Sequence, residues 1–222
     1  MIKGIIFDMD GVIVDSEYTF LESKAELLKD VGFPLGISYH YQFMGTTSEF
    51  MWKKIKEDLS LPGSVEDYIK EMTARRKEII KRDGLKPIEG VVEFIHRLAE
   101  ENVRLAVASS SPKKDIIHNL KELGIRDCFD ALVSGEEVNR SKPAPDVFLE
   151  AAKQIEIAPA ESLAFEDSHN GSIAVKKAGM FCVGVENDNY PPQDLSQADQ
   201  LISSFSEVEL KDLNRSFINN KK

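Results

Sequence analysis

The sequence predicts an α/β fold in which a doubly wound parallel sheet carries an inserted block of helices. Five short apolar runs are continuous rather than alternating, as is typical of strands buried on both faces of a parallel sheet. Helical patterns separate the later runs, and strands that alternate with helices are typical of a doubly wound sheet. A long segment after the first run contains helical patterns only. We therefore expect a five-stranded core sheet and a small α-helical insertion.

The five predicted strands span residues 4–7, 103–108, 129–134, 162–165 and 181–185. Between them, apolar residues recur at helical spacing. The predicted helix faces contain Val91, Phe94, Ile95 and Leu98; Ile116, Ile117, Leu120 and Leu123; Val147, Phe148, Ala151, Ala152 and Ile155; and Ile173, Ala174 and Ala178. Ser111 followed by Pro112 predicts the N-cap and first residue of the second helix, and Gly124 predicts its end.

The segment from about residue 18 to 84 breaks this alternation because it contains helical patterns alone. One predicted helix ends at Gly32, a second begins at a capping box formed by Thr46 and Glu49, and a third ends at Gly84. This segment is too long for a single crossover helix. We therefore predict a core domain of residues 1–16 and 85–222 and a helical cap domain of residues 17–84, with a frayed polar tail at 219–222.

Composition limits the classes of function. The chain has 222 residues and a net charge of -10, which argues against broad binding to nucleic acid. Cys128 and Cys182 stand far from other Cys or His residues in the sequence, so neither a disulfide framework nor a zinc site is indicated. The apolar run that Asp8 interrupts is too short for a signal peptide or a membrane span. We expect a cytoplasmic monomer that binds neither membrane nor nucleic acid.

Polar residues with catalytic chemistry follow four of the predicted strands. Ligands of open parallel sheets bind beyond the carboxyl ends of the strands. These residues are Asp8 and Asp10 after the first strand, Ser109, Ser110 and Ser111 after the second, Lys142 beyond the third, and Glu166 and Asp167 after the fourth. Carboxylates gathered at one edge repel one another unless a cation such as Mg²⁺ neutralises them. A lysine and hydroxyls beside such a metal suit a phosphate, so the pattern predicts phosphoryl transfer.

Asp8 and Asp10 can have different chemical roles. One carboxylate can attack phosphorus and form an aspartyl-phosphate, while the other transfers protons. Each residue also has a purely structural alternative. Asp8 and Asp10 can solvate a turn, Ser111 can cap a helix, and Lys142 can be a solvated loop residue. Glu166 with Asp167 can cap the next helix, a role that Ser168 or Asn170 could equally fill.

Four motifs in order resemble the haloacid dehalogenase-like (HAD) superfamily, in its phosphatase and β-phosphoglucomutase-like branch. They are "DMDGVIVDSE", "AVASSSP", "SKPAPDVF" and "FEDSHNG". The resemblance implies a Rossmann-like core in which the first, fourth and fifth strands lie together and the second and third lie beyond the first. It also implies that residues 11–17 form the hinge of a cap.

The resemblance also implies the roles of the site residues. Asp8 would be the nucleophile and Asp10 the general acid and base, while Ser109 and Lys142 would hold the phosphoryl group. Mg²⁺ would be bound by Asp8, the Asp10 backbone carbonyl and Asp167, with Glu166 bound directly or through water. Cap and loop residues would select the leaving group, and the candidates are His40, Met44, Gly45, Thr46, Arg75, Arg76, Lys77, Ser110 and Asn170.

The substrate is expected to be a small phosphorylated metabolite such as a sugar or polyol phosphate. The family's sugar-phosphate mutases carry a His shortly after the hinge and an Arg in the cap loop. This chain has no His between Asp15 and Leu21 and no Arg in "MGTTSEF", so hydrolysis is favoured over a β-phosphoglucomutase-type isomerisation. A phospho-receiver signalling domain is the alternative outside enzymology. The helical insertion and the second aspartate argue against it.

Overall fold

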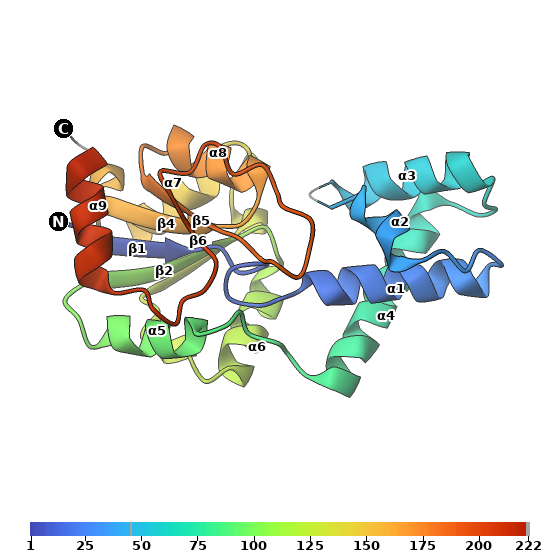
Figure 1. Cartoon of the computed structure of the whole chain (residues 1–222), viewed down its shortest axis with the longest axis horizontal. Coiled ribbons are helices and arrows are strands. Elements are labelled where there is room, and N and C mark those ends of the chain that lie inside the picture. The colour runs from blue at the N-terminus through green and yellow to red at the C-terminus, as the bar shows by residue number, and fades with distance from the viewer. Residues whose placement is uncertain (45, 221–222) are drawn as a thin grey trace. The chain divides into compact units, whose positions relative to one another are not determined.

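The computed structural model describes residues 1–44 and 46–220, and the chain forms two compact units (Figure 1). Met1–Asp15 and the chain from Leu85 onward form the first, which we call the core unit. Ser16–Gly84 form the second, which we call the helical unit. The chain thus enters the helical unit after Asp15, whereas the sequence predicted the boundary after residue 16. Both descriptions place the return to the core unit at Leu85.

A six-stranded sheet with parallel pairing throughout is the centre of the core unit, in the order β3-β2-β1-β4-β5-β6. The strands are β1 Gly4–Phe7, β2 Arg104–Ser109, β3 Ala131–Ser134, β4 Ser162–Glu166, β5 Phe181–Val185 and β6 Gln200–Ile202. The implied order of the first five strands is confirmed. The sixth strand, β6, lies at the edge of the sheet and was not among the five predicted strands. Its residues are partly exposed and therefore lack a continuous apolar run.

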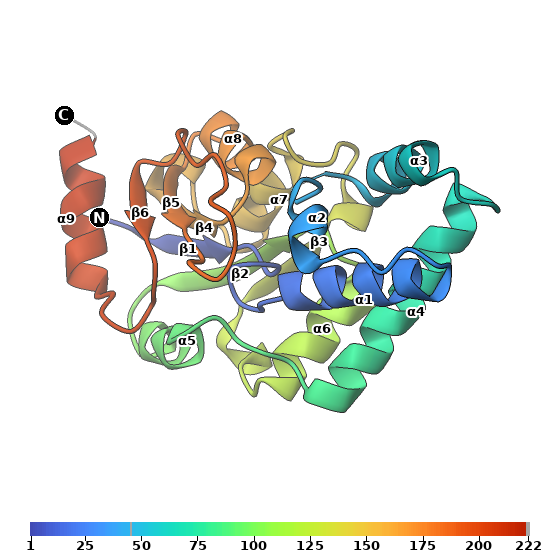
Figure 2. The ribbon, with the colours of Figure 1, turned by 45° about the vertical axis from the view of Figure 1, so that its right-hand side comes forward.

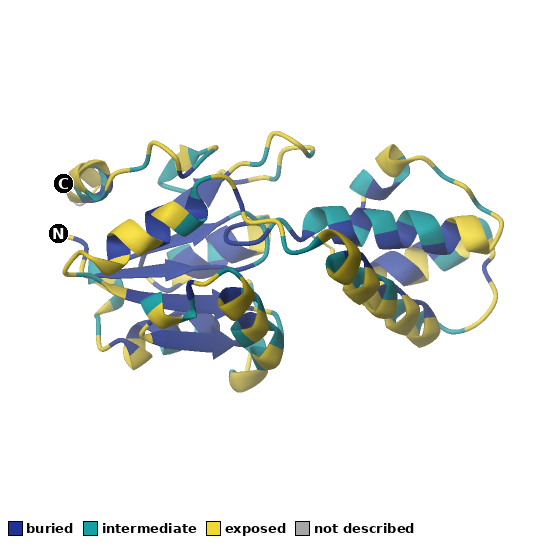
Figure 3. Cartoon of the chain, turned by 90° about the horizontal axis from the view of Figure 1, so that it is seen from below, coloured by how far each residue is buried: buried dark blue, intermediate teal, exposed yellow. Residues whose placement is uncertain are grey.

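Helices cover both faces of this sheet (Figures 1 and 2). They are α5 Val91–Ala99, α6 Lys113–Glu122, α7 Asp146–Gln154, α8 His169–Lys177 and α9 Leu210–Asn220, with 3-10 helices η1 Arg126–Cys128, η2 Gly135–Glu137 and η3 Pro159–Glu161. Ile5 and Phe7 belong to one apolar cluster with α5, α6 and α9. Ile6 belongs to a second cluster with α7 and α8. Alternate residues of β1 therefore pack against the helices on opposite faces of the sheet. Burial on both faces explains why the strands are continuously apolar (Figure 3).

The C-terminal segment differs from its prediction as a frayed tail. Asn219 and Asn220 are the last residues of α9, and residues 221–222 lie outside the described chain. Leu213 and Phe217 are buried in the core cluster, and Phe217 packs edge-on against Phe181 at 5.8 Å between ring centroids. Burial of these two side chains stabilises a helix that its polar sequence alone does not predict.

The helical unit contains α1 Glu17–Asp30, α2 Ile37–Tyr41, α3 Ser48–Leu59 and α4 Val65–Asp83. Its own apolar cluster surrounds Trp52, whose ring stacks on Tyr68 at 4.9 Å between centroids. The helix α2 was not predicted because five residues are too few for a periodic pattern. The capping box predicted at Thr46 was wrong as well. Thr47 is the N-cap of α3 and accepts from the Phe50 N–H, while the Thr46 hydroxyl donates to the Phe43 carbonyl.

Within residues 1–44 and 46–220, every helix is too short or too polar to cross a bilayer.

Candidate active site

Three strands bring their carboxyl ends together at one edge of the sheet. Phe7, the last residue of β1, is in register with Val107 of β2 on one side and with Phe165 of β4 on the other. The residues that follow these positions therefore lie at one edge. They include Asp8, Ser109 and Glu166, all of them buried. The predicted convergence of strand-end residues is thus a property of the strand register.

Lys142 joins two of these carboxylates. Its Nζ lies 2.8 Å from Asp8 Oδ1 and 2.7 Å from Glu166 Oε1. The Lys142 side chain is 9% exposed, and the Asp8 and Glu166 side chains are 7% and 1% exposed. Lys142 is therefore a buried partner of the predicted nucleophile and not a solvated loop residue.

Glu166 is held at both carboxylate oxygens. Oε1 accepts from Lys142, and Oε2 accepts from the Ser168 backbone N–H at 2.7 Å and from the Ser168 hydroxyl at 2.9 Å. The Ser168 side chain is also the N-cap of α8, where it accepts from the Gly171 N–H at 3.1 Å. The N-terminus of α8 and the Lys142 ammonium thus fix the Glu166 carboxylate in one orientation.

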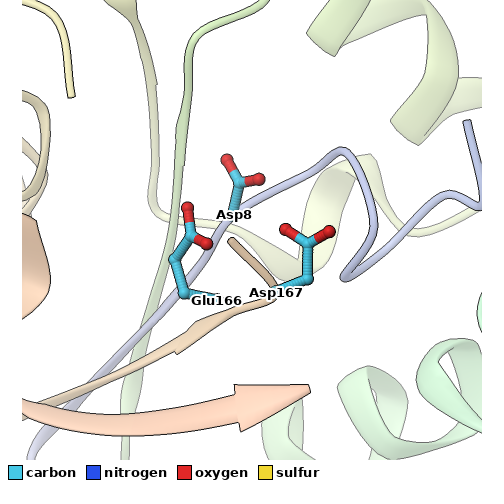
Figure 4. A group of neighbouring side chains, drawn as sticks. All are labelled: Asp8, Glu166 and Asp167. Atoms are coloured by element: carbon cyan, nitrogen blue, oxygen red, sulfur yellow. The ribbon is translucent and has the colours of Figure 1, made fainter. Parts of the chain in front are cut away.

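A cluster of three carboxylates lies next to the Lys142 ammonium. Asp8, Glu166 and Asp167 each offer one oxygen, and these oxygens lie within 4.8 Å of one another (Figure 4). Gly11, at φ 79°, makes room for them because a β-carbon there would lie 1.9 Å from Asp167 Oδ2. The tight turn after Asp10 therefore requires glycine both for its backbone conformation and for its closeness to Asp167.

The shifted pKa values of these groups indicate that the positive charge of Lys142 does not balance the negative charge of the neighbouring carboxylates. Burial raises the pKa of Asp8 to about 7, Lys142 opposes that shift, and the Glu166 and Asp10 charges add to it. Burial also raises the pKa of Asp167, and the Glu166 and Asp8 charges raise it further. The pKa of Lys142 rises because Asp8 and Glu166 together outweigh its own desolvation. One ammonium is too little for this cluster, and a hard divalent cation with oxygen ligands fits it.

The second aspartate has a different environment. Asp10 is half-buried, and its Oδ2 accepts a 2.6 Å hydrogen bond from the Ser111 hydroxyl. Pro112 is the N-cap of α6, which has no side-chain cap bond, so the predicted capping role of Ser111 was wrong. The Ser109 hydroxyl, fully buried, accepts from the Ser111 N–H at 3.0 Å, and Ser110 is exposed.

The substrate-selecting candidates of the helical unit have varied surroundings, and Gly45 lies outside the described residues. His40 is buried with neither ring nitrogen hydrogen-bonded. Met44 is half-buried, and Thr46 and Lys77 are exposed.

The two candidate arginines of α4, Arg75 and Arg76, already have partners inside the helical unit. Arg75 pairs with Asp30 at 2.8 Å and with Glu71 at 3.0 Å. The Arg76 guanidinium lies 3.2 Å from the Phe20 ring centroid, and its Nε donates to the Thr19 hydroxyl. In the core unit, the remaining candidate Asn170 is exposed at the start of α8.

Three further residues support the site: Gly171 and Ser134 were not singled out from the sequence, and Ser168 was considered only as a possible cap of α8, which it is. Ser168 holds the Glu166 carboxylate, and the Gly171 N–H donates to the Ser168 hydroxyl. Ser134, at the end of β3, is fully buried and donates through its hydroxyl to the Ser111 carbonyl at 2.7 Å. The available signal was that Ser134 ends a predicted strand, just as Ser109 directly follows one. Small polar residues at strand ends are common, so that signal alone was weak.

Comparison with known proteins identifies the family. The family model of the haloacid dehalogenase-like hydrolases matches residues 5–185, so the chain belongs to that family. The chain is therefore an enzyme of a hydrolase family, as the four motifs indicated. The phospho-receiver alternative is set aside by this membership.

Individual relatives match nearly the full length. The Bacillus subtilis protein YhcW is 34% identical over 212 residues, covering 95% of each chain. A phosphorylated carbohydrates phosphatase of Thermotoga maritima is 29% identical over 178 residues, covering 80% of this chain and 82% of its own. A beta-phosphoglucomutase of Bacillus subtilis is 32% identical over 222 residues, covering 94% and 92%. The relatives therefore include both a phosphatase and a mutase.

A solved structure supports the fold assignment. The crystal structure of CbbY from Rhodobacter sphaeroides in complex with phosphate is similar with a TM-score of 0.78 and 25% identity. The similarity covers 96% of this chain and 100% of that chain. The Rossmann-like α/β architecture predicted from the sequence is thus shared with this structure.

Proposed function

We propose that this enzyme is a Mg²⁺-dependent phosphatase that hydrolyses a small phosphorylated metabolite, a sugar or polyol phosphate, through an aspartyl-phosphate formed on Asp8. The observation that carries the proposal is the Lys142 ammonium between the buried carboxylates of Asp8 and Glu166. That arrangement holds the nucleophile beside a cation that can also bind phosphoryl oxygens. The named activity of the Thermotoga maritima relative supports a phosphorylated carbohydrate as the substrate class.

The carboxylate cluster is the proposed metal site. Asp8, Asp167 and the Asp10 backbone carbonyl would hold Mg²⁺, with Glu166 acting through water because Lys142 and Ser168 already use its two oxygens. When bound, the metal would offset the negative charge of the carboxylates and of the transferring phosphoryl group.

The residues of the chain then divide the work between two steps. In the first, an Asp8 oxygen attacks phosphorus while the Asp10 carboxyl gives its proton to the leaving oxygen. In the second, the Asp10 carboxylate takes a proton from water as that water attacks phosphorus, and the bond between phosphorus and Asp8 breaks. Lys142 and the Ser109 hydroxyl would bind the phosphoryl oxygens throughout, and Ser110 would contribute from the same loop.

The helical unit is the proposed cap, and its residues would select the leaving group. Our candidates remain His40, Met44, Thr46, Arg76 and Lys77, with Asn170 from the core unit. Arg75 is a weaker candidate because it pairs with Asp30 and Glu71.

Phosphate release is the direct test of this proposal. Wild-type enzyme with Mg²⁺ should release phosphate from 4-nitrophenyl phosphate, and activity should stop with EDTA and return with added Mg²⁺. Asp8→Asn should be inactive under all these conditions, because an amide oxygen is a far weaker nucleophile. Activity that survives EDTA or the Asp8→Asn substitution would contradict the proposal. A screen of sugar, polyol and nucleotide phosphates would then identify the substrate.

The named mutase relative supports a second candidate, β-phosphoglucomutase-type isomerisation. The absence of His between Asp15 and Leu21 and of Arg in 44–50 favours hydrolysis. Interconversion of hexose 1- and 6-phosphates, primed by a bisphosphate and faster than phosphate release, would establish the mutase instead. We propose a cytoplasmic monomer, and gel filtration with light scattering checks its oligomeric state.

A further inference from the structure

The Ser111 hydroxyl is committed to the Asp10 carboxylate. Its Oγ lies 2.6 Å from Asp10 Oδ2, a short distance for a hydroxyl that donates to a carboxylate oxygen. The Ser111 hydroxyl does not cap helix α6, because the N-cap of that helix is Pro112. Within the described part of the chain, Ser111 is the side chain that hydrogen-bonds this carboxylate.

The backbone of Ser111 is fixed on both sides. Its N–H donates to Ser109 Oγ at 3.0 Å, and its carbonyl accepts from Ser134 Oγ at 2.7 Å. Ser109 and Ser134 are the paired last residues of the neighbouring strands β2 and β3, and both are fully buried. The sheet edge therefore holds the Ser111 backbone, and rotation about one side-chain bond remains to direct the hydroxyl toward Asp10.

The neighbouring loop supports the same arrangement. A β-carbon at Gly135 would lie 3.2 Å from the Ser110 α-carbon, so the chain after β3 packs directly on the serine loop. The Ser134 hydroxyl also accepts from the Glu136 N–H at 3.2 Å. A chain of hydrogen bonds thus runs from the end of β3 through Ser111 to Asp10.

We propose that Ser111 is the positioning residue of the Asp10 carboxyl group in both half-reactions. Its hydroxyl holds Oδ2, so that Oδ1 is the oxygen that exchanges the proton. In the first half-reaction Asp8 forms a bond to phosphorus, the bond to the leaving oxygen breaks, and that oxygen takes the proton from Asp10. In the second, water bonds to phosphorus, the Asp8 bond breaks, and the Asp10 carboxylate takes the proton of water. Ser111 keeps its own proton in both, and the inference rests on the proposed phosphatase function.

The dependence on the leaving group separates this role from a merely structural one. The phenolate that leaves phenyl phosphate needs a proton as it departs, whereas the 2,4-dinitrophenolate that leaves 2,4-dinitrophenyl phosphate departs without one. A misplaced Asp10 carboxyl therefore slows the reaction of phenyl phosphate far more. For Ser111→Ala we expect kcat/KM to fall about tenfold with phenyl phosphate, from the loss of the hydrogen bond that orients the Asp10 carboxyl, and less than about threefold with 2,4-dinitrophenyl phosphate. The parameter kcat/KM is chosen because it reports on the first phosphoryl transfer and not on the later hydrolysis.

Three further variants complete the test. Ser111→Thr retains a hydroxyl and should restore the phenyl phosphate activity, and exposed Ser203→Ala is the matched control. In the Asp10→Asn background, Ser111→Ala should cause no further loss, because two residues that act as one unit are not additive. Equal losses with both substrates, no loss with either, or additive losses would overturn the proposal. Activity retained in Asp8→Asn would instead refute the proposed function itself, so the two failures are distinguishable.

Discussion

The Glu166 carboxylate lies directly against the α-carbon of Gly171. A β-carbon built at Gly171 would be 1.7 Å from Glu166 Oε1, the same oxygen that accepts from Lys142 at 2.7 Å. The first turn of α8 therefore has room for the Glu166 carboxylate because residue 171 has no side chain. Residue 171 therefore influences the position of Lys142 through Glu166, although glycine itself has no side chain.

Gly171→Ala should displace Glu166 and, with it, Lys142. We expect phosphate release to fall at least about tenfold and the unfolding free energy to fall by about 1–3 kcal/mol from overpacking. Gly36→Ala is the matched control, because Gly36 has an ordinary φ of -67° and its nearest neighbour to a new β-carbon would be 3.9 Å away. Activity measured beside thermal unfolding checks the prediction. Wild-type activity in Gly171→Ala would show that the carboxylate moves aside at no cost.

Lys142→Met should leave two buried carboxylates without their ammonium. The Asp8 pKa, already about 7, should rise further because Lys142 lowers it. A carboxyl with a folded pKa above the unfolded value of 3.8 loses stability as pH rises from 3.8 through the folded pKa. We expect destabilisation of about 3–5 kcal/mol at pH 8, and less at pH 5.

Urea unfolding followed by circular dichroism in EDTA measures that difference. Lys3→Met is the control, because Lys3 forms a surface pair with Glu161 at 59% and 40% side-chain exposure and should lose less than about 1 kcal/mol. A Lys142→Met penalty that is independent of pH would argue that the carboxylates stay ionised and find other partners.

Mg²⁺ should stabilise the folded enzyme even without substrate. A ligand that binds the folded state alone adds about 2.7 kcal/mol at a concentration 100 times its dissociation constant, which raises Tm by about 5–10 °C in a chain of this size. Asp167→Asn should abolish most of that rise, and exposed Asp188→Asn should retain it. Differential scanning fluorimetry across a Mg²⁺ titration makes the comparison. An undiminished rise in Asp167→Asn would place the metal elsewhere.

The helical unit should lose stability in mild acid through His40. Burial lowers the pKa of His40 to about 4, and the Lys24 charge adds to that shift. The unfolded chain, with a pKa of 6.5, therefore binds the proton first, and stability falls as pH drops from 6.5 through 4. The full effect corresponds to about 3 kcal/mol.

Trp52 is the one tryptophan of the chain and is buried in the helical unit, so its fluorescence reports on unfolding there. Urea midpoints of the wild type should fall between pH 7 and 4 more steeply than those of His40→Met. Exposed His118→Gln should follow the wild-type curve. Parallel curves for the wild type and His40→Met would show that another group governs the acid sensitivity.

The sequence predicted the parts of this structure that depend on burial at both faces of a sheet. β1 and β5 have the predicted bounds, and Asp8, Ser109, Glu166 and Asp167 lie at or beside strand ends. Lys142 reaches Asp8 and Glu166 from the loop after β3. β6 and α2 were not predicted because three and five residues form no periodic pattern. The role of Ser111 was assigned incorrectly, because a serine before a helix is normally its cap, and the competing acceptor, Asp10, is 101 residues away in the chain.

The position of β1 has a consequence for synthesis of the chain. β1 is made before the other strands of the sheet, yet its neighbours in the sheet are β2 and β4, and β4 ends at Glu166. The contiguous helical unit can complete its own core long before that point. We expect nascent chains that stop before β4 to expose the apolar surface of β1 and to depend on chaperones until β4 has been made.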